Sequence, residues 1–468
     1  MLDTTYYQPG AQAMEDGQFY AAAIMFQEAS NAAKYEQNKK DFKKLYDLAM
    51  KRYTQFNKGT GGGGGSQGGG GKSNDEDAPK DIVPEPLIKD NKYVRTFNDL
   101  AGMDQEKAQI TDSFITPLKF PETLKADRNL LLYGPPGTGK SFIVTALCCE
   151  LWNSLGGPGK TTVNLFLLTG AEVKGKYVGE TEKNLKHAFE QAQALAEETN
   201  GRTVIFMDEV DAIAGDRNSG DPTMTSSVNA LLAILEGAGQ GYKDVIYIAA
   251  TNYPWMLDGA IVRRFNKKIM LDIPSTAAIS ELISLKVGGE RIVQDTVSKT
   301  KMANRINGLA LSLSWSSDGI AELRKNLEDM GFKGPKADAA FESFMLQGGH
   351  QAHSNTQFEP IFPLGVSFSD VDKGMDTGLN EVGMALLQQE NPQLGCCPIQ
   401  SKKCMSNDIP ECVLTPDQRK TLTLKKSFVY KYWLYIKDSM QRFGSTVNSM
   451  DYAQVVYYRL TGNPPPMA

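Results

Sequence analysis

Short runs of apolar residues alternate with amphipathic stretches from about residue 96 onward. The runs predict β-strands, and the stretches between them predict helices. Continuous apolar strands that alternate with helices are typical of a parallel sheet covered by helices on both faces. The five runs are Leu130–Tyr133, Val163–Leu168, Val204–Met207, Val245–Ala249 and Ile269–Ile273. We therefore predict an α/β fold, with a parallel five-stranded sheet in a large subdomain at 96–280.

The carboxyl-terminal part of the chain follows a different pattern. Residues 281–345 show helical periodicity, which predicts a small helical subdomain. Residues 346–468 form a divergent C-terminal region that is irregular as far as residue 420. A stretch at 421–443 predicts a closing helix in this region.

The first 58 residues are predicted to be helical. A stripe from Phe19 to Ala33 and a second from Phe42 to Phe56 each fall on one helical face. With a weaker helix at 10–16, they predict an antiparallel three-helix bundle over 1–58. Such a bundle either has no partner or offers a groove between its helices to a partner helix.

A glycine-rich and then acidic segment at 59–95 separates the bundle from the sheet. Its first part, GTGGGGGSQGGGGK, cannot bury a core and predicts a flexible linker. Flexible-coil scaling gives this linker a root-mean-square reach of roughly 30 Å. The sequence therefore predicts a tethered amino-terminal module.

Composition and charge narrow the class of protein. Apolar residues make up 41% of the chain and charged residues 22%, as in ordinary globular proteins. The net charge is −5 without a dense basic tract, which argues against direct binding of nucleic acid. No run of eighteen apolar residues predicts a membrane span, and the start, MLDTTYYQPG, does not resemble a signal peptide.

The cysteines and histidines do not predict a metal site. Two adjacent cysteine pairs make a poor disulfide framework, so we expect reduced thiols and a cytoplasmic protein. His350 and His353 lie in a polar stretch and are expected to be solvated. Free thiols are favoured over zinc where C-x-x-C spacing is missing, as it is for Cys396, Cys397, Cys404 and Cys412.

A P-loop follows the first predicted strand and opens a helix, and it is the strongest chemical signal in the chain. Backbone N–H groups of such a loop close on phosphate oxygens, and the helix N-terminus favours negative charge. Lys140 places a positive charge at the β- and γ-phosphates of ATP, and the Ser141 hydroxyl suits Mg²⁺. The alternative is a glycine-rich turn that arose by chance, and such a turn would not need a strand before it and a helix after it. The loop consists of Gly134, Pro135, Pro136, Gly137, Thr138, Gly139, Lys140 and Ser141.

Two later strands also end in polar residues. Asp208 and Glu209 follow the run VIFM, where Asp208 can hold Mg²⁺ and Glu209 can act as the base for the attacking water. Asn252 ends the next strand and can hydrogen-bond the γ-phosphate or this water. The alternatives are a solvated acidic turn and an ordinary strand-end residue. Together with the P-loop, these residues predict an ATP hydrolase.

Arg263 and Arg264 follow eleven to twelve positions after Asn252. Two arginines there can stabilise the charge of a phosphoryl-transfer transition state. The alternative is a solvated basic patch shared with Lys267 and Lys268.

These motifs, in this order, resemble the AAA ATPases over residues 96–275. The resemblance implies a P-loop NTPase sheet with a helical lid subdomain, a hexameric ring, and arginine fingers, matched by Arg263 and Arg264, that act on the neighbouring subunit. It also implies that Asn252 is the first sensor and that Lys176, Tyr177 and Val178 form a pore loop that grips a polypeptide. Further nucleotide contacts are implied for Asp99, Ala101, Gly102 and Phe142.

The amino-acid sequence around the two arginines resembles that of the meiotic clade of this family. The amino-terminal pattern resembles a microtubule interacting and trafficking (MIT) domain, and we prefer this over a single tetratricopeptide repeat, which cannot bury its own face. An MIT domain with one AAA cassette is similar to the vacuolar protein sorting four ATPases, ahead of spastin and katanin. Segment 315–320 matches the family only loosely, and residues 346–468 match no part of it well.

The subfamily resemblance implies a substrate and a place in the cell. The expected substrate is an ESCRT-III-type filament recruited through the MIT-like domain, at endosomal or other remodelling membranes that the protein reaches through its partners. Microtubule severing is the alternative, and the acidic linker disfavours it because tubulin is acidic. A nucleotide-gated binding module is the alternative from another class, and the presence of Glu209 and the arginines argues against it.

Overall fold

The computed structural model falls into two compact units, which we describe separately. The first holds the described residues up to Asn98 together with Asp104–Tyr133 and Lys140–Met270; the second holds Asp99–Met103, Gly134–Gly139 and the described residues from Leu271 on. The predicted three-helix bundle and nearly all of the predicted helix at 421–443 lie outside the described residues. The structure describes 82–466 with gaps at 90–91, 121, 158–159, 176–178, 218–221, 238–241, 288–295, 351–361, 363, 379–438, 440–441 and 443–444.

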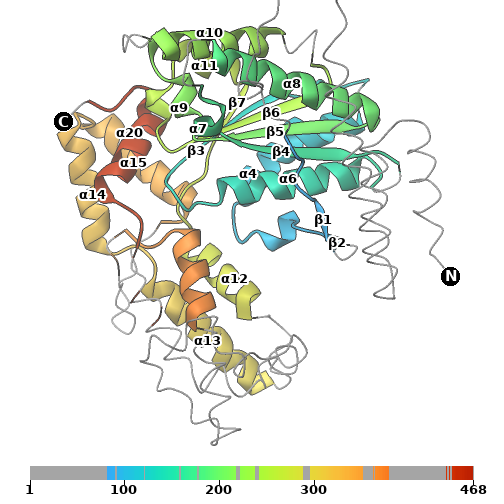
Figure 1. Ribbon diagram of the computed structural model, residues 1–468. Helices are drawn as coiled ribbons and strands as arrows, with labels where there is room; N and C mark the ends of the chain where they lie inside the picture. The colour runs from blue at the N-terminus through green and yellow to red at the C-terminus, as the bar shows by residue number, and fades with distance from the viewer. Residues whose placement is uncertain are drawn as a thin grey trace, which may run out of the picture. The chain divides into compact units, whose positions relative to one another are not determined.

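A five-stranded parallel sheet forms the centre of the first unit, which confirms the predicted fold class (Figure 1). Its strand order is β4-β5-β6-β3-β7, so the P-loop strand β3 lies between β6 and β7. Every residue of β3 and of β6 is buried, as expected for strands covered on both faces. The strands are β3 (Asn129–Tyr133), β4 (Val163–Thr169), β5 (Arg202–Asp208), β6 (Val245–Thr251) and β7 (Lys267–Met270).

Helices cover both faces of this sheet, with α6 on one side and α8 and α10 on the other (Figure 1). Leu185, Phe189 and Leu195 are fully buried on α8 and belong to the core that also contains Ile205 and Tyr247 from the sheet. Burial of these side chains is the main stabilising term for the layer. The helices of this unit are α4 (Asp104–Ile110), α5 (Thr116–Lys119), α6 (Lys140–Ser154), α7 (Gly170–Val173), α8 (Glu180–Glu198), α9 (Asp211–Ala214), α10 (Pro222–Gly237) and α11 (Gly259–Arg264).

Shorter elements complete the first unit. Thr111–Ile115 (η3) is a turn of π-helix that joins α4 to α5. A two-stranded antiparallel hairpin is formed by β1 (Ile88–Lys89) and β2 (Lys92–Tyr93). Two 3₁₀ turns are η5 (Pro254–Met256) and η2 (Phe97–Asp99), of which the last residue, Asp99, belongs to the second unit.

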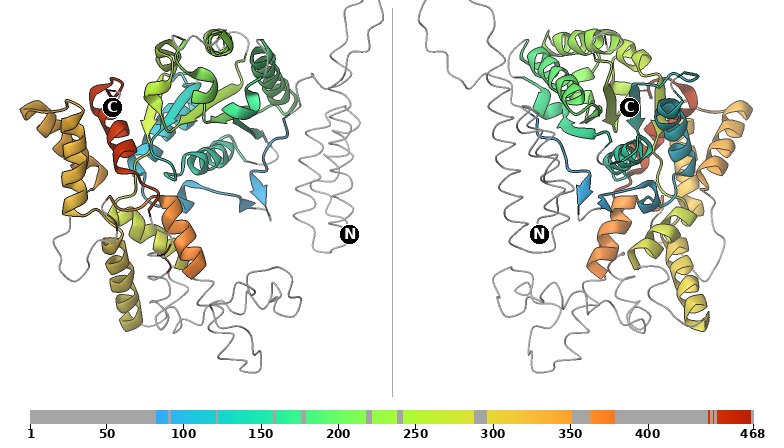
Figure 2. Two further views of the ribbon diagram at one scale, coloured as in Figure 1. Left: turned by 60° about the vertical axis from the view of Figure 1, so that its left-hand side comes forward. Right: turned by 90° about the vertical axis from the view of Figure 1, so that its right-hand side faces the viewer.

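The second unit is helical in the part that the structure describes. α12 packs against α13, and α14 packs against the last helix, α20, which Figure 2 draws in red. Its helices are α12 (Thr276–Val287), α13 (Thr296–Ser312), α14 (Ser317–Asp329), α15 (Pro335–Gly348) and α20 (Ser449–Thr461). None of the helices in the described ranges has the length and apolar character needed to cross a membrane.

The helix α20 was not expected from the sequence, which predicted a closing helix only at 421–443. Asn448 caps its N-terminus by accepting hydrogen bonds from the N–H groups of Met450 and Asp451. Gly462 ends it in the left-handed conformation. Tyr452 and Val456 lie on its buried face.

His350 is buried, so the expectation that it would be solvated is wrong. Only 2% of its surface is exposed, and its ring lies 4.6 Å from the ring of Trp315. Its Nε2 lies 2.9 Å from Asp272 Oδ2, and Tyr452 donates a hydrogen bond to the other oxygen of Asp272. Burial, followed by the nearby Asp272 carboxylate, raises the pKa of the Tyr452 hydroxyl well above its usual value.

Candidate functional site

The loop Gly134–Gly139 joins the end of β3 to the start of α6, as predicted for a P-loop. Gly134 and Gly137 have φ angles of 148° and 76°, which favour glycine strongly. A side chain at Gly134 would also meet the Leu271 carbonyl oxygen at 2.0 Å. Thr138 is buried and donates its hydroxyl hydrogen bond to the carbonyl of Pro135. The loop conformation therefore depends on glycine at these two positions.

Lys140 is the first residue of α6 and is nearly buried, with 7% of its surface exposed. Its ammonium group donates a hydrogen bond of 2.7 Å to Asn252 Oδ1, which comes directly after β6. Burial lowers the pKa of Lys140 to about 8, and the carboxylates of Asp208 and Asp211 partly offset this effect. The charge of Lys140 thus lies among the polar ends of β5 and β6.

Ser141 and Asp208 face each other across the same edge of the sheet. The Ser141 hydroxyl lies 3.4 Å from Asp208 Oδ2, and both groups are oxygen donors of the kind that Mg²⁺ prefers. Mg²⁺ usually keeps several waters and binds substrate phosphates, so two protein oxygens are enough. Within the described ranges no cluster of three or more His, Cys, Asp or Glu could hold a metal by itself. The residues present therefore fit a Mg²⁺ ion bound together with a nucleotide.

Glu209 follows Asp208 at the end of β5 and is exposed. Its φ angle is 50°, which is unusual for a residue with a side chain. Its N–H donates to Asp208 Oδ1, and its carbonyl accepts from the N–H of Ala212. Backbone strain of this kind is frequent at functional sites.

Asp211 belongs to the same cluster, although the sequence analysis did not select it. Its Oδ1 accepts a hydrogen bond of 2.5 Å from the Thr251 hydroxyl at the end of β6. Thr251 Oγ1 in turn accepts from the N–H of Tyr253, which follows Asn252. In the sequence, the only signal for Asp211 is an acidic residue three positions after Asp208. Asp211 positions the turn that carries Asn252.

The two predicted arginines lie in the last turn of α11. Asp258 caps this short helix and also pairs with Arg217. Arg263 is exposed, and it has no ion-pair partner among the described residues. Arg264 forms an ion pair with Glu236 of α10, in which both side chains are half exposed.

Comparison with known proteins decides the family of this segment. Residues 130–273 match the ATPase family associated with various cellular activities (AAA). This segment is an AAA domain. It contains β3, the P-loop, Asp208, Asn252 and both arginines.

The curated relatives of the chain match it over this domain. Human vacuolar protein sorting-associated protein 4A is 34% identical over 197 residues, which are 41% of this chain and 42% of that protein. The Dictyostelium discoideum vacuolar protein sorting-associated protein 4 is 32% identical over 222 residues, 46% of this chain and 45% of that protein. The chain thus spans less than half of the length of these relatives.

A plant relative and a solved structure are also similar to parts of the chain. The Arabidopsis thaliana protein SUPPRESSOR OF K(+) TRANSPORT GROWTH DEFECT 1 is 32% identical over 198 residues, 41% of this chain and 42% of that protein. The crystal structure of the FIGL-1 AAA domain aligns with 79% of this chain and 91% of that chain, at 16% identity and a TM-score of 0.45.

The segment predicted to contact adenine belongs to the second unit, as does the loop Gly134–Gly139. Leu100 and Ala101 are buried, while Asp99 is exposed. The N–H of Gly102 donates a 2.7 Å hydrogen bond to Glu281 of α12, and a side chain at Gly102 would meet Ala278. In the first unit, the ring of Phe142 is covered by the Arg95 guanidinium at 3.9 Å.

The predicted pore loop of the AAA domain, Lys176–Val178, lies outside the described residues, but both of its stems are anchored. The N–H of Gly175 donates to the hydroxyl of Thr181 on α8. The Asn184 side chain donates to the carbonyl of Val173 at the end of α7. The described residues on both sides of this segment are therefore joined by hydrogen bonds.

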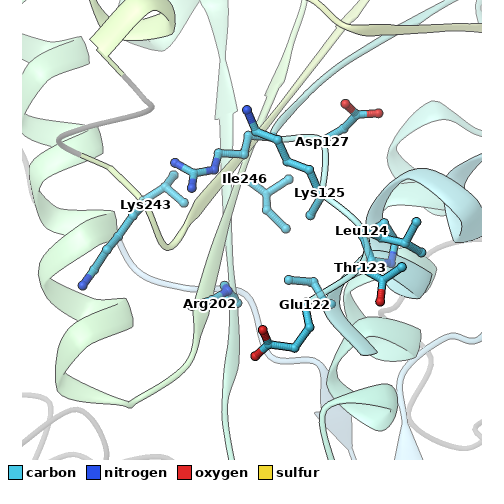
Figure 3. Close-up of a pocket in the computed structure, with 13 residues that line it drawn as sticks. Glu122, Thr123, Leu124, Lys125, Asp127, Arg202, Lys243 and Ile246 are labelled. Atoms are coloured by element: carbon cyan, nitrogen blue, oxygen red, sulfur yellow. The ribbon is translucent and has the colours of Figure 1, made fainter. Parts of the chain in front are cut away.

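A pocket of about 440 Å³ opens at the amino ends of the strands, opposite the P-loop end of the sheet (Figure 3). It lies between 117–128 and the first residues of β5 and β6, Arg202 and Val245. The P-loop side chains follow the carboxyl ends of the strands, whereas this pocket is at their amino ends. It is therefore separate from the candidate nucleotide site of the AAA domain.

Proposed function

We propose that this chain is a Mg²⁺-dependent ATPase that uses hydrolysis to remodel protein assemblies. The observation that carries the proposal is the cluster at the carboxyl ends of three adjacent strands. There Lys140 contacts Asn252, and Ser141 contacts Asp208 beside Glu209. A protein that binds a nucleotide without hydrolysing it would not need a general base at the position of Glu209.

The proposed roles follow from the chemistry of each group. Loop N–H groups and Lys140 bind the β- and γ-phosphates, and Ser141 with Asp208 would hold Mg²⁺, which neutralises charge on the phosphates when bound. Glu209 accepts a proton from the attacking water, and Asn252 orients this water or the γ-phosphate. The Lys140 ammonium donates a hydrogen bond to Asn252, so phosphate oxygens would replace or share that contact.

The basic test is steady-state ATP hydrolysis by the purified full chain with and without Mg²⁺. Lys140→Ala is the matched inactive variant, because it removes the charge that contacts the phosphates. Hydrolysis that requires Mg²⁺ and is lost in Lys140→Ala supports the proposal. No hydrolysis by the unaltered chain at any concentration would contradict it.

We further propose that the chain assembles into a hexameric ring and pulls polypeptide through its pore. The names of the vacuolar protein sorting relatives support a substrate in membrane traffic, and an ESCRT-III-type filament is the substrate that we propose. The MIT-like module at 1–58 would bind filament tails, and membrane association would be peripheral. The anchored stems beside Gly175 and Asn184 support Tyr177 as the gripping residue, since an aromatic ring contacts varied side chains.

Tyr177→Ala is expected to leave basal ATP hydrolysis within about twofold of the unaltered chain and to stop substrate unfolding, because it removes the proposed gripping group and leaves every proposed phosphate contact in place. The measurement is loss of fluorescence from a folded reporter fused to a filament subunit. Phe120→Ala is the control, since Phe120 is an aromatic residue that is 58% exposed on another part of the first unit. Unfolding at the normal rate by Tyr177→Ala would show that this loop does not grip substrate.

Deletion of residues 1–58 is expected to spare ATP hydrolysis and to weaken binding to assembled filaments. A flexible linker raises the local concentration of the AAA domain at the filament and transmits little force. Co-sedimentation with ESCRT-III-type filaments and with microtubules measures the effect and compares the two substrate classes. Equal filament binding with and without 1–58 would rule out a docking role for this module.

A further inference from the structure

The P-loop has a second contact that the motif does not predict. Within the second unit, the N–H of Ser369 donates a 3.1 Å hydrogen bond to the carbonyl oxygen of Gly137. Ser367 also lies close to this loop, because a Cβ atom added at Gly137 would meet Ser367 Oγ at 2.5 Å. The chain at 367–369 therefore packs directly against the phosphate-binding loop.

Fixing this carbonyl has a consequence for the next peptide N–H. In a trans peptide the C=O of one residue and the N–H of the next point in opposite directions within one plane. The hydrogen bond from Ser369 to the Gly137 oxygen therefore directs the Thr138 N–H away from Ser369. Loop N–H groups such as this one are what a P-loop offers to phosphate oxygens.

A reciprocal capping box holds the turn that carries Ser369. The N–H of Asp370 donates to Ser367 Oγ, and the N–H of Ser367 donates to Asp370 Oδ2 at 2.9 Å. These bonds start the helix that begins at residue 368. The position of the Ser369 N–H thus depends on the Asp370 carboxylate.

Asp370 also connects this turn to the segment before α20. Its Oδ2 accepts hydrogen bonds of 3.0 Å from both the N–H and the hydroxyl of Thr446. Only 6% of Asp370 is exposed, and no lysine or arginine pairs with it in the described part of the chain. A buried carboxylate that depends on such donors is costly to leave without them.

We propose that Asp370 is a positioning residue for the P-loop, which ties the Gly137–Thr138 peptide to the segment before α20. This inference rests on the proposed ATPase function. Asp370 does not touch the nucleotide; it fixes Ser369, which fixes the carbonyl of Gly137. Affinity for phosphate should therefore depend on Thr446, more than 300 residues from Gly137 in sequence.

The test is the affinity of the full chain for ADP and ATP, measured by displacement of a fluorescent ADP analogue. Asp370→Asn keeps the size of the side chain but replaces the Oδ2 acceptor with an amide in one of its two orientations. We expect Kd for both nucleotides to rise about tenfold, the scale of a charged hydrogen bond. KM for ATP should rise with it while kcat stays within about twofold, because binding rather than chemistry is weakened.

Thr446→Val is the second variant, because it removes the hydroxyl contacts to Asp370 Oδ2 and Ser367 Oγ, keeps the backbone bond to Asp370, and keeps the shape of the side chain. It should raise Kd about threefold, less than Asp370→Asn does, because the N–H of Thr446 still donates to Asp370. Asn448→Ala is the matched control, because Asn448 lies two residues after Thr446 and caps the N-terminus of α20. Loss of this cap should lower Tm without changing Kd.

The outcomes separate this inference from the function on which it rests. If the unaltered chain does not bind ADP, the proposed function fails. If it binds ADP, and folded Asp370→Asn binds within twofold of it, the positioning role is wrong. The same holds if Asn448→Ala weakens ADP binding as much as Asp370→Asn does. If Asp370→Asn does not fold, an unchanged Kd in Thr446→Val overturns the inference.

Discussion

Arg264→Ala is expected to lower the ATPase rate by about 10³–10⁵-fold, the effect of removing an arginine finger. Arg264 lies in the last turn of α11 and is half exposed, so in the proposed ring it is open to contact with a neighbouring subunit. The nucleotide site of the same subunit already has one positive charge, that of Lys140. An arginine from a neighbour would complete the site only on assembly, so specific activity should rise with protein concentration.

Mixing variants tests whether the arginine acts between subunits. Arg264→Ala retains a complete P-loop, whereas Lys140→Ala retains Arg264. Mixed rings should therefore regain part of the activity that each variant lacks alone. Wild-type hydrolysis by Arg264→Ala, together with specific activity that does not change with concentration, would contradict the proposal.

The ion pair with Glu236 provides a control that the sequence did not suggest. Arg264 must leave Glu236 in order to reach a phosphate on another subunit. Glu236→Gln weakens this pair and leaves every proposed catalytic group in place. Its rate should equal or exceed that of the unaltered chain, and a loss as large as that of Arg264→Ala would show that the pair itself is required.

Glu209→Gln is expected to lower hydrolysis by about 10²–10⁴-fold, the range for loss of a general base. The amide keeps the size of the side chain but cannot accept the proton of the attacking water. Glutamine meets the φ of 50° at this position under the same steric limits as glutamate, so the backbone strain is unchanged. Single-turnover and steady-state phosphate release measure the effect.

ATP binding should survive in Glu209→Gln, and the variant should trap its substrate for identification by pull-down. Glu182→Gln is the control, since Glu182 is exposed in the first turn of α8 and the change in charge is the same. The control should hydrolyse ATP normally. Near-normal hydrolysis by Glu209→Gln would remove Glu209 from the mechanism.

The order of strands and motifs in the AAA domain could be predicted because each is a local pattern. The strand predicted at Leu130–Tyr133 is β3, extended by Asn129. The last strand was predicted at Ile269–Ile273 and is Lys267–Met270. Met270 pairs with Tyr133, where β3 ends, so the apolar residues after Met270 have no strand beside them. Lys267 and Lys268 pair with Leu130 and Leu131 of β3. This backbone pairing makes them part of the strand although their side chains are polar.

The sequence by itself determined the α/β class, the P-loop and the residues that end β5 and β6, because apolar periodicity and loop chemistry act over a few neighbouring positions. Only the tertiary structure decided which distant residues meet. Lys140 lies 112 positions from Asn252, Ser369 reaches Gly137 from a segment still farther along the chain, and Thr446 lies 76 positions from Asp370. It also placed His350 in a buried contact with Asp272. Such pairings depend on sheet register and helix packing, to which residues across the whole chain contribute.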